Sequence, residues 1–382
     1  MSVREARDSR TDVGPEPRDA MMRTATGCAV TVASLYRRGM APTSSRRDLG
    51  LAAVARAAGV STATVSNVLN RPHMVAATTQ ARVRAAIAAL DFVPNRAAAT
   101  LRQGSNRMLG LVIPDVVNPF YAAMVDAVVD AADRHRYAVV LCVSHDDPAR
   151  ELRHFDMLAE QRAAGALVMP VTADSSRLSR LRAIGARLIL IDRTADEHEM
   201  CSVAVDDVSG GRLAVEHLLR TPFAGVTIVN GSGAIRQCAD RREGALIALA
   251  IAGAPADSLV EIEVPQMSID EGVAAGRRIA RTGAPRRIFC TNDLLAVGVI
   301  RGLVAEGVAV PDDAEVVGYG DLALGTAESL LLTTIGQPKH ELGASAVAKL
   351  MAELEDGSAH AHTATVLAPT LIVRGSTSAK AP

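Results

Sequence analysis

The spacing of hydrophobic residues changes once along the chain, near residue 108. Before that point, apolar residues recur every three or four positions, as they do on one face of an amphipathic helix. After it, short continuous runs of Val, Ile and Leu alternate with helical patterns, which is typical of parallel strands covered by helices on both faces. The pattern predicts a small all-α module followed by a larger α/β body.

The first predicted helix covers residues 51–58. Its inward face is formed by apolar residues at helical spacing, namely Leu51, Val54, Ala55 and Ala58. Gly59 suits the positive φ of a residue that ends a helix. Ser61 is placed to accept a hydrogen bond from the first amides of a second helix.

The second predicted helix carries small, mostly polar residues on its outer face. Val65, Val68 and Leu69 are expected to point inward. The positions left outside are Thr62, Ala63, Thr64, Ser66 and Asn67. Two helices joined by a tight glycine turn form a helix-turn-helix, whose second helix fits the major groove of DNA. The alternative interpretation is an αα-hairpin in an ordinary helical core.

A third helix is predicted over residues 75–90, with apolar residues at core spacing at Val83, Ile87 and Leu90. Pro94 closes this unit, and residues 95–104 form one more short helical segment. Residues 1–47 mix Arg, Asp, Pro, Ser and Thr without sustained periodicity, so this extension is expected to be disordered.

The body after residue 108 alternates strand-like runs with helical patterns. The strand-like runs cover residues 109–113, 138–143, 166–169, 187–191, 225–229, 259–264, 287–290 and 315–317. Helical patterns between them include residues 122–134, 213–219, 239–251, 273–280 and 294–305. These 275 residues are too many for one sheet, so we expect two doubly wound lobes with parallel sheets. A ligand would bind at the carboxyl ends of the strands that face the cleft.

Charge is divided unevenly between the two parts. Residues 46–107 hold nine Arg against Asp48 and Asp91, a net charge of +7. Residues 108–382 hold 25 basic and 35 acidic residues, a net charge of −10, although the whole chain carries only −1. A basic module fused to an acidic body is typical of a protein that binds phosphates by one end.

Other functional classes lack their sequence signals. No apolar run reaches the ~18 residues of a membrane span, and no export-signal pattern opens the chain. The glycines of residues 230–236 lack the third glycine of a dinucleotide fingerprint, and no P-loop, G-x-S-x-G or H-E-x-x-H motif occurs. We therefore expect neither an enzyme nor a membrane protein, and no cofactor.

The cysteines and histidines predict no metal site. The five cysteines include no C-x-x-C pair, which disfavours a zinc ribbon, and their odd number disfavours a disulfide framework. They are Cys28, Cys142, Cys201, Cys238 and Cys290. Reduced thiols in a cytoplasmic protein are the simplest interpretation. Three histidines on predicted helices have no partner at metal-ligand spacing, namely His135, His154 and His217.

Three motifs in order resemble the LacI/GalR family of transcription regulators. They are V-S-x-A-T-V-S-x-V-L-N at residues 60–70, D-F-V-P-N-R-A-A-x-x-L at residues 91–101, and L-G-L-V-I-P-D-V-V-N-P-F-Y at residues 109–121. The resemblance covers residues 48–377 and implies a homodimeric regulator, in the usual case a repressor, of double-stranded operator DNA under control of a small-molecule effector.

The resemblance also implies a domain plan. A helix-turn-helix domain would span residues 48–93 and a hinge helix with linker residues 94–107. A two-lobed effector-binding and dimerisation domain, like a periplasmic sugar-binding protein, would span residues 108–382, with crossovers near residues 205 and 335. The alternative is a solute-binding receptor whose helical N-terminus serves only assembly.

By this resemblance, the residues that contact DNA lie on the second helix and around it. The base-reading positions fall at Thr62, Ala63 and Asn67, where Asn can pair bidentately with adenine and Thr can touch a thymine methyl. Thr62 alternatively serves only as a helix cap. Ser61 and Thr64 belong to the same surface, and Asn70 and Thr79 are placed for phosphate contacts. Ala76 departs from the usual Ser, so one cap or phosphate contact is expected to be missing.

The hinge segment carries a leucine that, in the family, inserts into the central minor-groove step. Leu101 matches that leucine, and Arg96 and Arg102 would meet the flanking phosphates. Three consecutive alanines, Ala97 to Ala99, leave a narrow helix that can enter a groove. The alternative is that Leu101 is an ordinary buried helix residue.

The family's effector-contacting positions fall on strand ends and following loops. They match Asn118, Phe120, Tyr121, Asp192, Arg241, Met267, Asn292 and Asp293. The paired aromatics could instead serve lobe packing, and Asp293 could also cap the helix that follows. Gly320 stands where relatives usually have a ligand-holding aspartate, and Asp321 could replace that aspartate only if the loop shifts. The resemblance therefore does not assign a standard sugar as the effector, and another small polar ligand is an alternative.

Overall fold

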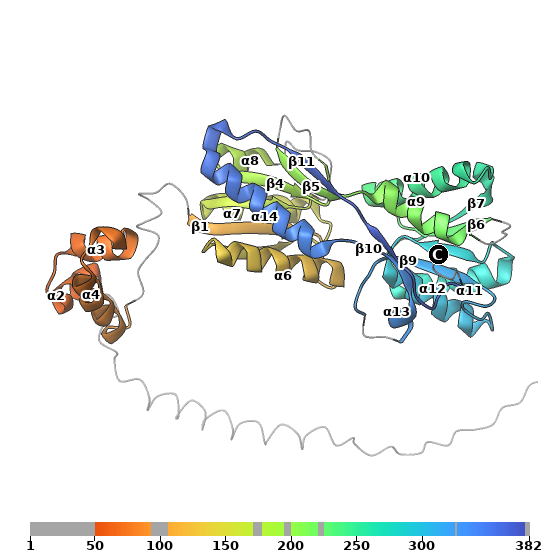
Figure 1. Ribbon diagram of the computed structural model, residues 1–382, viewed down its shortest axis with the longest axis horizontal. Coiled ribbons are helices and arrows are strands. Elements are labelled where there is room, and N and C mark those ends of the chain that lie inside the picture. Colours follow the sequence, from red (N-terminus) through yellow and green to blue (C-terminus); the bar gives the residue numbers. More distant parts are fainter. Residues whose placement is uncertain are drawn as a thin grey trace, which may run out of the picture. The chain divides into compact units, whose positions relative to one another are not determined.

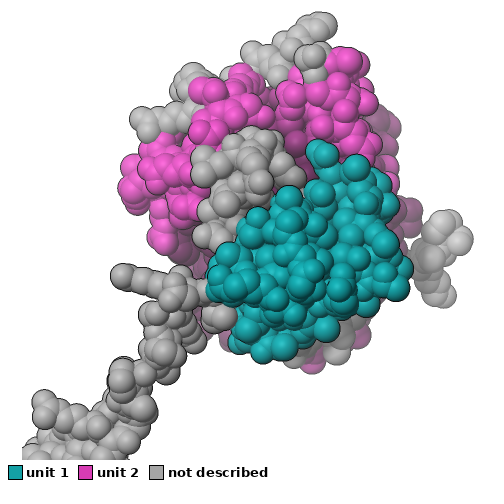
Figure 2. All heavy atoms as spheres, turned by 90° about the vertical axis from the view of Figure 1, so that its left-hand side faces the viewer, with its two compact units in different colours: residues 1–95 teal, residues 96–382 magenta. Residues whose placement is uncertain are grey.

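The computed structural model describes residues 50–92, 106–170, 178–194, 200–220, 225–324 and 327–378. The chain divides into two compact units, residues 1–95 and 96–382, which Figure 2 distinguishes by colour. Several predictions lie outside the described residues: the disorder of residues 1–47, the hinge helix with Arg96, Leu101 and Arg102, and the side chain of Asn70.

The first unit is the predicted bundle of three helices. These are α2 (Leu51–Ala58), α3 (Thr62–Asn70) and α4 (Ala77–Ala89), with the 3-10 turn η2 (Pro72–Met74) between the last two. Val54, Val65 and Val83 are fully buried at its centre. Gly59 ends α2 at φ +63°, and the Ser61 hydroxyl accepts from the Thr64 amide at 3.1 Å, so both predicted helix boundaries are confirmed.

One local feature of this unit differs from its prediction, and one agrees with it. Leu69, predicted to point inward, is 36% exposed, whereas Val65 and Val68 of the same helix are buried as predicted. The start of α4 has no side-chain cap at Ala76, as predicted. Gln80 stabilises this region instead, because its side-chain amide donates to the carbonyls of Pro72 (2.7 Å) and Val75 (2.9 Å).

The second unit contains two six-stranded sheets, each the centre of one lobe (Figure 1). The first lobe has the strand order β11-β5-β4-β3-β1-β2. Its strands are β1 (Asn106–Ile113), β2 (Ala138–Val143), β3 (Ala163–Val168), β4 (Arg187–Ile191), β5 (Cys201–Val205) and β11 (Ala364–Leu367). All of its pairings are parallel.

The second lobe has the strand order β12-β10-β9-β8-β6-β7. Its strands are β6 (Val226–Asn230), β7 (Leu259–Glu263), β8 (Arg287–Cys290), β9 (Glu315–Gly320), β10 (Thr333–Gly336) and β12 (Thr370–Ile372). Among the strands described in this lobe, only β12 runs antiparallel to its neighbour. The predicted two-lobed, parallel-dominated architecture is therefore confirmed.

Helices cover both faces of each sheet. In the first lobe they are α6 (Pro119–Arg134), α7 (Pro148–Glu160), α8 (Ser179–Ala183) and α14 (Lys339–Asp356). The core on one face joins residues of α6 and α14, and the core on the other joins residues of α7 and α8. Within the described residues, no helix has the length and apolar character to cross a membrane.

In the second lobe the helices are α9 (Asp207–Leu218), α10 (Arg236–Ile251), α11 (Ile269–Thr282), α12 (Asp293–Ala305) and α13 (Ala327–Leu331), with the 3-10 turn η4 (Ala256–Ser258). Residues of α11 and α12 form the core on one face, and residues of α9 and α10 form the core on the other.

The chain crosses between the lobes three times. The crossings follow β5 into α9, β10 into α14, and β11 into β12. The first two of these crossings lie near residues 205 and 335. The first lobe is consequently completed by α14, the 3-10 turn η5 (Gly357–Ala359) and β11, which follow most of the second lobe in sequence.

Glycines bring α9 and α10 into close contact. A Cβ atom at Gly211 would lie 2.0 Å from the Arg241 carbonyl oxygen, and one at Gly244 would lie 2.0 Å from the Val208 carbonyl oxygen. Both obstacles are backbone atoms, so a side chain at either position would force the helices apart.

We expect Gly244→Ala to lower the stability of the second unit by about 1–3 kcal/mol, because overpacking outweighs the better helix propensity of Ala. The melting temperature of the full chain should fall by about 2–10 °C. Gly233→Ala is the matched control, since no atom lies within 4 Å of a Cβ at that position. Equal melting temperatures for the two variants would contradict the close-packing argument.

Candidate effector cleft and DNA-reading helix

A cavity of about 100 Å³ opens between the two lobes. It lies where several parallel strands end, the position at which α/β sheets bind ligands. Seven of the eight predicted effector residues line it: Asn118, Phe120, Tyr121, Asp192, Arg241, Met267 and Asn292. The remaining lining residues are Ile235, Gln237, Cys238, Tyr319, Gly320, Leu322 and Gln337.

The aromatic wall of the cavity is fixed by the start of α6. Asn118 caps this helix by accepting from the Phe120 amide at 3.0 Å, and the Asp115 carboxylate accepts from the Asn118 amide at 3.2 Å. Phe120 and Tyr121 meet edge to face, with ring centroids 5.2 Å apart. Burial raises the pKa of the Tyr121 hydroxyl, so it faces the cavity as a neutral donor.

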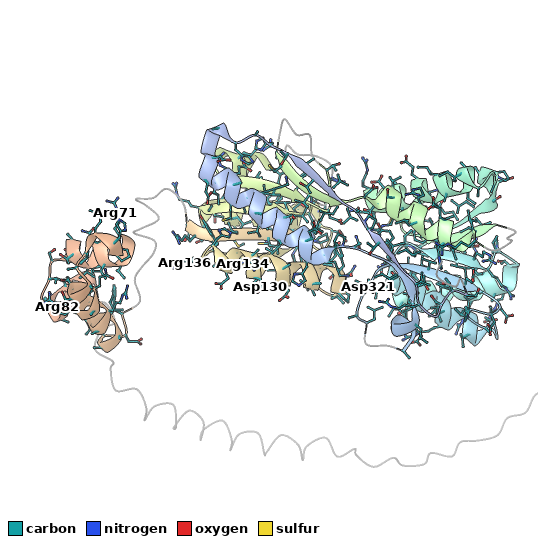
Figure 3. All side chains as sticks on the ribbon, in the orientation of Figure 1. Arg71, Arg82, Asp130, Arg134, Arg136 and Asp321 are labelled. Carbon is teal, nitrogen blue, oxygen red and sulfur yellow. The ribbon has the colours of Figure 1, made fainter. Side chains whose placement is uncertain are left out.

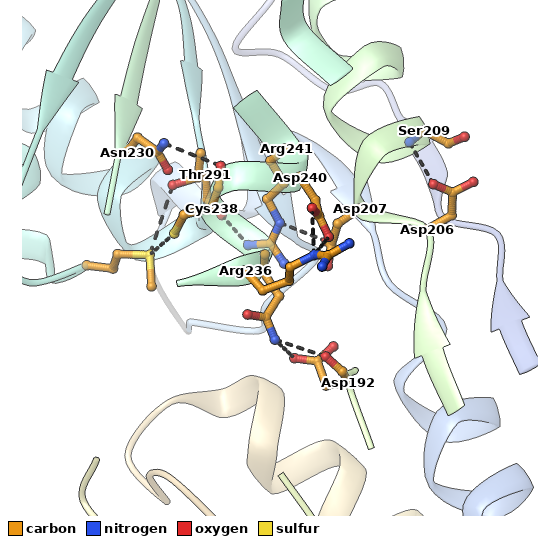
Figure 4. A network of polar contacts seen from close by, with 12 residues as sticks. Asp192, Asp206, Asp207, Ser209, Asn230, Arg236, Cys238, Asp240, Arg241 and Thr291 are labelled. Atoms are coloured by element: carbon orange, nitrogen blue, oxygen red, sulfur yellow. Dashed lines mark hydrogen bonds and ion pairs between the residues drawn. The ribbon is translucent and has the colours of Figure 1, made fainter. Parts of the chain in front are cut away.

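Asp192 is the most unusual group in the cleft. It follows β4 with φ +59°, a backbone conformation that Asp tolerates better than most residues. Its Oδ2 accepts from Gln237 of the second lobe at 2.9 Å, and the same amide donates to the Asp192 carbonyl at 3.0 Å (Figure 4). Its buried Oδ1 has no hydrogen-bond partner. Burial, together with the nearby Asp207 carboxylate, raises the pKa of Asp192 to about 7.

Arg241 is held firmly before any ligand arrives. Its Nε donates to Asp207 Oδ1 at 2.8 Å and its Nη1 to the Thr291 carbonyl at 2.7 Å (Figure 4). The guanidinium also lies 3.8 Å from the centre of the Tyr319 ring, a favourable cation–π geometry. The close packing of α9 and α10 positions this pair, so Arg241 contributes a fixed positive charge to the cleft.

The floor of the cavity in the second lobe is formed by the sulfur atoms of Cys238 and Met267 and by the side-chain amide of Asn292. Cys238 Sγ lies 3.7 Å from Met267 Sδ. Asn292 donates to the Met267 carbonyl at 3.0 Å and accepts from the Leu295 amide at 2.8 Å, which makes Asn292 the cap of α12. Burial raises the pKa of the Cys238 thiol, so the floor is uncharged.

The structure places two predicted carboxylates outside the cavity lining. Asp293 is directed behind it, because its oxygens accept from Thr334 Oγ1 at 2.6 Å and the Leu322 amide at 2.7 Å. The alternative role of Asp293 as cap of the following helix is wrong, since Asn292 occupies that position. Asp321 is bound to Arg374 at 2.7 Å and does not replace the aspartate missing at Gly320.

Three polar or aromatic lining residues were missed by the sequence reasoning. Gln237 lies in the first turn of α10, Tyr319 is next to last in β9, and Gln337 lies in a crossing. Tyr319 could have been found from the sequence, because it lies at the end of a strand, where ligands bind. Nothing in the hydrophobic pattern distinguishes Gln237 from a solvent-exposed helix residue.

The predicted DNA-reading positions lie on an accessible surface of the first unit. Ser61, Thr62, Ala63 and Asn67 are exposed, and Thr64 and Thr79 are half-buried. Ser61 is engaged as the cap of α3, which leaves Thr62 free of that role. Arg71 and Arg82 are exposed on the same unit (Figure 3), available for phosphates.

Comparisons with known proteins cover both units. A family model described as periplasmic binding proteins and sugar binding domain of LacI family matches residues 106–373, and one described as bacterial regulatory proteins, lacI family, matches residues 51–95. The HTH-type transcriptional repressor PurR of Photobacterium profundum is 31% identical, over 85% of this chain and 97% of the relative.

Solved structures give the same result. The lac repressor dimer bound to operator and the anti-inducer ONPF is 25% identical with a TM-score of 0.75, covering 85% of this chain and 98% of that chain. The complex of the transcriptional regulator CelR with cellobiose is 27% identical with a TM-score of 0.63, covering 85% of this chain and 99% of that chain.

We expect Asp192→Asn to change how stability depends on pH. The pKa of Asp192 is raised in the folded protein, so the protonated carboxyl stabilises the fold fully below about pH 4, and this contribution is lost as the pH rises through about 7. Urea unfolding from pH 5 to 8 should show wild type losing stability relative to Asp192→Asn. A difference between the two proteins that is independent of pH would contradict the burial of this charge.

Proposed function

The chain belongs to the LacI family of bacterial regulatory proteins, and we propose that it is a repressor whose operator affinity is set by a small polar effector at Asp192. It is a DNA-binding transcription regulator with a separate ligand-binding body. The observation that supports this site is the cavity at the strand ends, where a buried carboxylate oxygen of Asp192 has no partner. A ligand hydroxyl or N–H would supply that partner.

Contacts between the lobes provide the means of control. Gln237 bridges to Asp192, and Lys339 at the start of α14 donates to the carbonyls of Gly320 (2.5 Å) and Asp321 (2.9 Å) in the second lobe. An effector that donates to the free Oδ1 of Asp192 binds beside the Gln237 bridge, so its affinity depends on whether the lobes are arranged to keep that bridge. Such a ligand shifts the equilibrium only by its difference in affinity for the two arrangements.

The cleft favours a compact effector with hydroxyl groups and an apolar face. Its volume of about 100 Å³ is below the ~300–1,000 Å³ usual for ligand pockets, so the lobes must open for entry or the ligand must be small. Phe120 and Tyr121 offer an apolar face, and Asp192 and Arg241 offer the polar contacts. The neighbouring CelR complex contains cellobiose, a sugar. Gly320 removes one carboxylate, so we assign the class of sugar-like polyols rather than one sugar.

The effector site is tested by melting the full chain with sugars, polyols and purines, then repeating any positive titration with Asp192→Asn. A ligand of this site should stabilise wild type, lose at least tenfold in affinity in the variant, and change operator binding. Stabilisation by a ligand that binds both proteins equally would place the effector elsewhere.

Operator recognition is assigned to the exposed face of α3. Thr62, Ala63 and Asn67 are directed outward from a helix whose opposite face is fixed by Val65 and Val68. Asn67 carries an amide that matches the donor and acceptor of adenine in the major groove.

Dimerisation is assigned to the edge of the sheets formed by β2 and β7. Leu141 on β2 is 42% exposed, and Val260 on β7 is 37% exposed. Ile251, at the end of α10, is 68% exposed beside that second edge. The solved lac repressor is a dimer on its operator, and two copies of this chain joined here would bring two reading helices to one site.

We expect Asn67→Arg to change the preferred operator without unfolding the first unit, since one base-edge pairing contributes about 1–3 kcal/mol of discrimination. Binding-site selection on both proteins measures this. Ala85→Arg, on the exposed face of α4, adds the same charge elsewhere and should leave the selected sequence unchanged. If all three proteins select the same sequence, Asn67 does not read bases.

We expect Leu141→Glu to weaken self-association at least tenfold and operator binding with it, because a charge would be buried at the centre of the contact. Analytical ultracentrifugation and fluorescence anisotropy measure the two effects. Val366→Glu is the matched control, since Val366 is 53% exposed on β11, the opposite edge of the same sheet. A stable Leu141→Glu dimer, or a monomeric Val366→Glu protein, would move the interface elsewhere.

A further inference from the structure

Four potential metal ligands from three chain segments meet in the first lobe, at the opposite end of β5 from the effector cleft. Cys201 begins β5, Glu353 lies in the last turns of α14, and His360 and His362 lie between η5 and β11. One donor atom from each residue lies within 4.8 Å of the donor atoms of the other three. Cys201 and Glu353 are buried, at 0% and 4% exposure.

The sulfur atom is at the centre of this cluster. Cys201 Sγ lies 3.3 Å from His360 Nε2 and 3.8 Å from His362 Nδ1. The Thr363 amide also donates to this sulfur, at 3.3 Å. A tetrahedral zinc ion with bonds of about 2.0–2.3 Å holds its donor atoms about 3.3–3.8 Å apart, so both sulfur–nitrogen distances already suit one ion.

The surroundings of His360 resemble those of a metal ligand. Its second ring nitrogen, Nδ1, lies 3.0 Å from Asp356 Oδ2. Histidines that bind metals commonly donate their other ring N–H to a carboxylate, which fixes the tautomer and directs the free nitrogen at the ion. Asp356 therefore leaves Nε2 of His360 as an acceptor that faces the Cys201 sulfur.

Glu353 supplies an independent indication that this cluster suits a cation. Its Oε1 makes a long ion pair with Arg187 Nη1 at 4.0 Å, but its buried Oε2 has no hydrogen-bond partner. A buried carboxylate oxygen without a partner costs free energy that a bound cation would offset. The carboxylate, two imidazoles and a thiolate together make a complete tetrahedral ligand set.

We propose that Cys201, Glu353, His360 and His362 form a binding site for a divalent transition-metal ion of the zinc class. The donor set decides the class: thiolate and imidazole ligands select zinc and similar ions, whereas Mg²⁺ and Ca²⁺ require oxygen ligands. The site is closed, with four protein ligands, which is the arrangement of structural rather than catalytic zinc.

Such an ion would hold together β5 and β11, the strands that lead into two of the three crossings between the lobes. The ion would join the first residue of β5 to the segment that enters β11, and these strands pair in parallel from Ser202–Ala364 to Val205–Leu367. Both strands continue directly into the second lobe. At about 3.3 Å per residue, the ion would lie roughly 13 Å from the crossings.

The binding test uses the full chain after dialysis against a chelator, titrated separately with ZnCl₂, CoCl₂ and MgCl₂. We expect one Zn²⁺ per chain, a rise in melting temperature, and no effect of Mg²⁺. Co²⁺ should give the absorption bands of a tetrahedral ion with a thiolate ligand. Absence of Zn²⁺ binding, or a Co²⁺ spectrum without a thiolate band, would overturn the proposal and leave a hydrogen-bonded Cys–His cluster.

Variants assign the binding to these residues. Cys201→Ser should abolish the Co²⁺ thiolate band, Glu353→Gln should weaken Zn²⁺ binding at least tenfold, and Asp356→Asn should weaken it about 10–100-fold through His360. Cys142→Ser, at a second buried thiol of the same lobe, is the matched control. Retention of the thiolate band in Cys201→Ser, or its loss in the control, would place the metal elsewhere. The Asp356 side chain is exposed, so the Asp356→Asn variant is expected to fold. It therefore tests the site even if the variants of the buried residues unfold.

Discussion

The second unit depends on one buried ion pair. Asp207 opens α9 directly after the chain has crossed between the lobes, and Arg241 reaches it from α10. Both side chains are less than 10% exposed, so losing either partner would leave a buried charge at a cost of about 3–5 kcal/mol. The same guanidinium contacts the Thr291 carbonyl and Tyr319. The Asp207–Arg241 pair thus connects a crossing between the lobes, the contact of α9 with α10, and the proposed effector cleft.

This arrangement explains why the cleft is preorganised on one side and adaptable on the other. The second-lobe wall is held by Arg241, whose Nε and Nη1 donate to Asp207 and Thr291, and by Asn292, which bonds to Met267 and Leu295. The first-lobe wall presents Asp192, with one oxygen bonded to Gln237 and the other without a partner. A ligand therefore gains most free energy at Asp192, the group that also bridges the lobes.

Much of the fold was predictable from periodicity, since β2, β4 and β8 have the predicted bounds. The strands missed were β5, β10, β11 and β12, which are the strands that adjoin the crossings between the lobes. Seven of the eight positions predicted from the motifs line the cavity. The place of Asp293 outside this lining was not predictable, because it depends on a side-chain conformation that directs the carboxylate to Thr334. The cluster around Cys201 was not predictable from the sequence, since Glu353 follows Cys201 by 152 positions.

The three crossings also determine the order in which the parts of the chain can fold during synthesis. A ribosome that adds about 5–20 residues per second completes the first unit early, because residues 51–89 are contiguous. The first lobe must wait for α14 and β11, so after β5 leaves the ribosome the sheet face that α14 covers stays open for roughly 10–30 seconds. During that interval the nascent chain exposes apolar residues such as Leu109, Leu111 and Met124, which α14 later buries. Chaperones would find their target in this half-built lobe, while the reading helix is already folded.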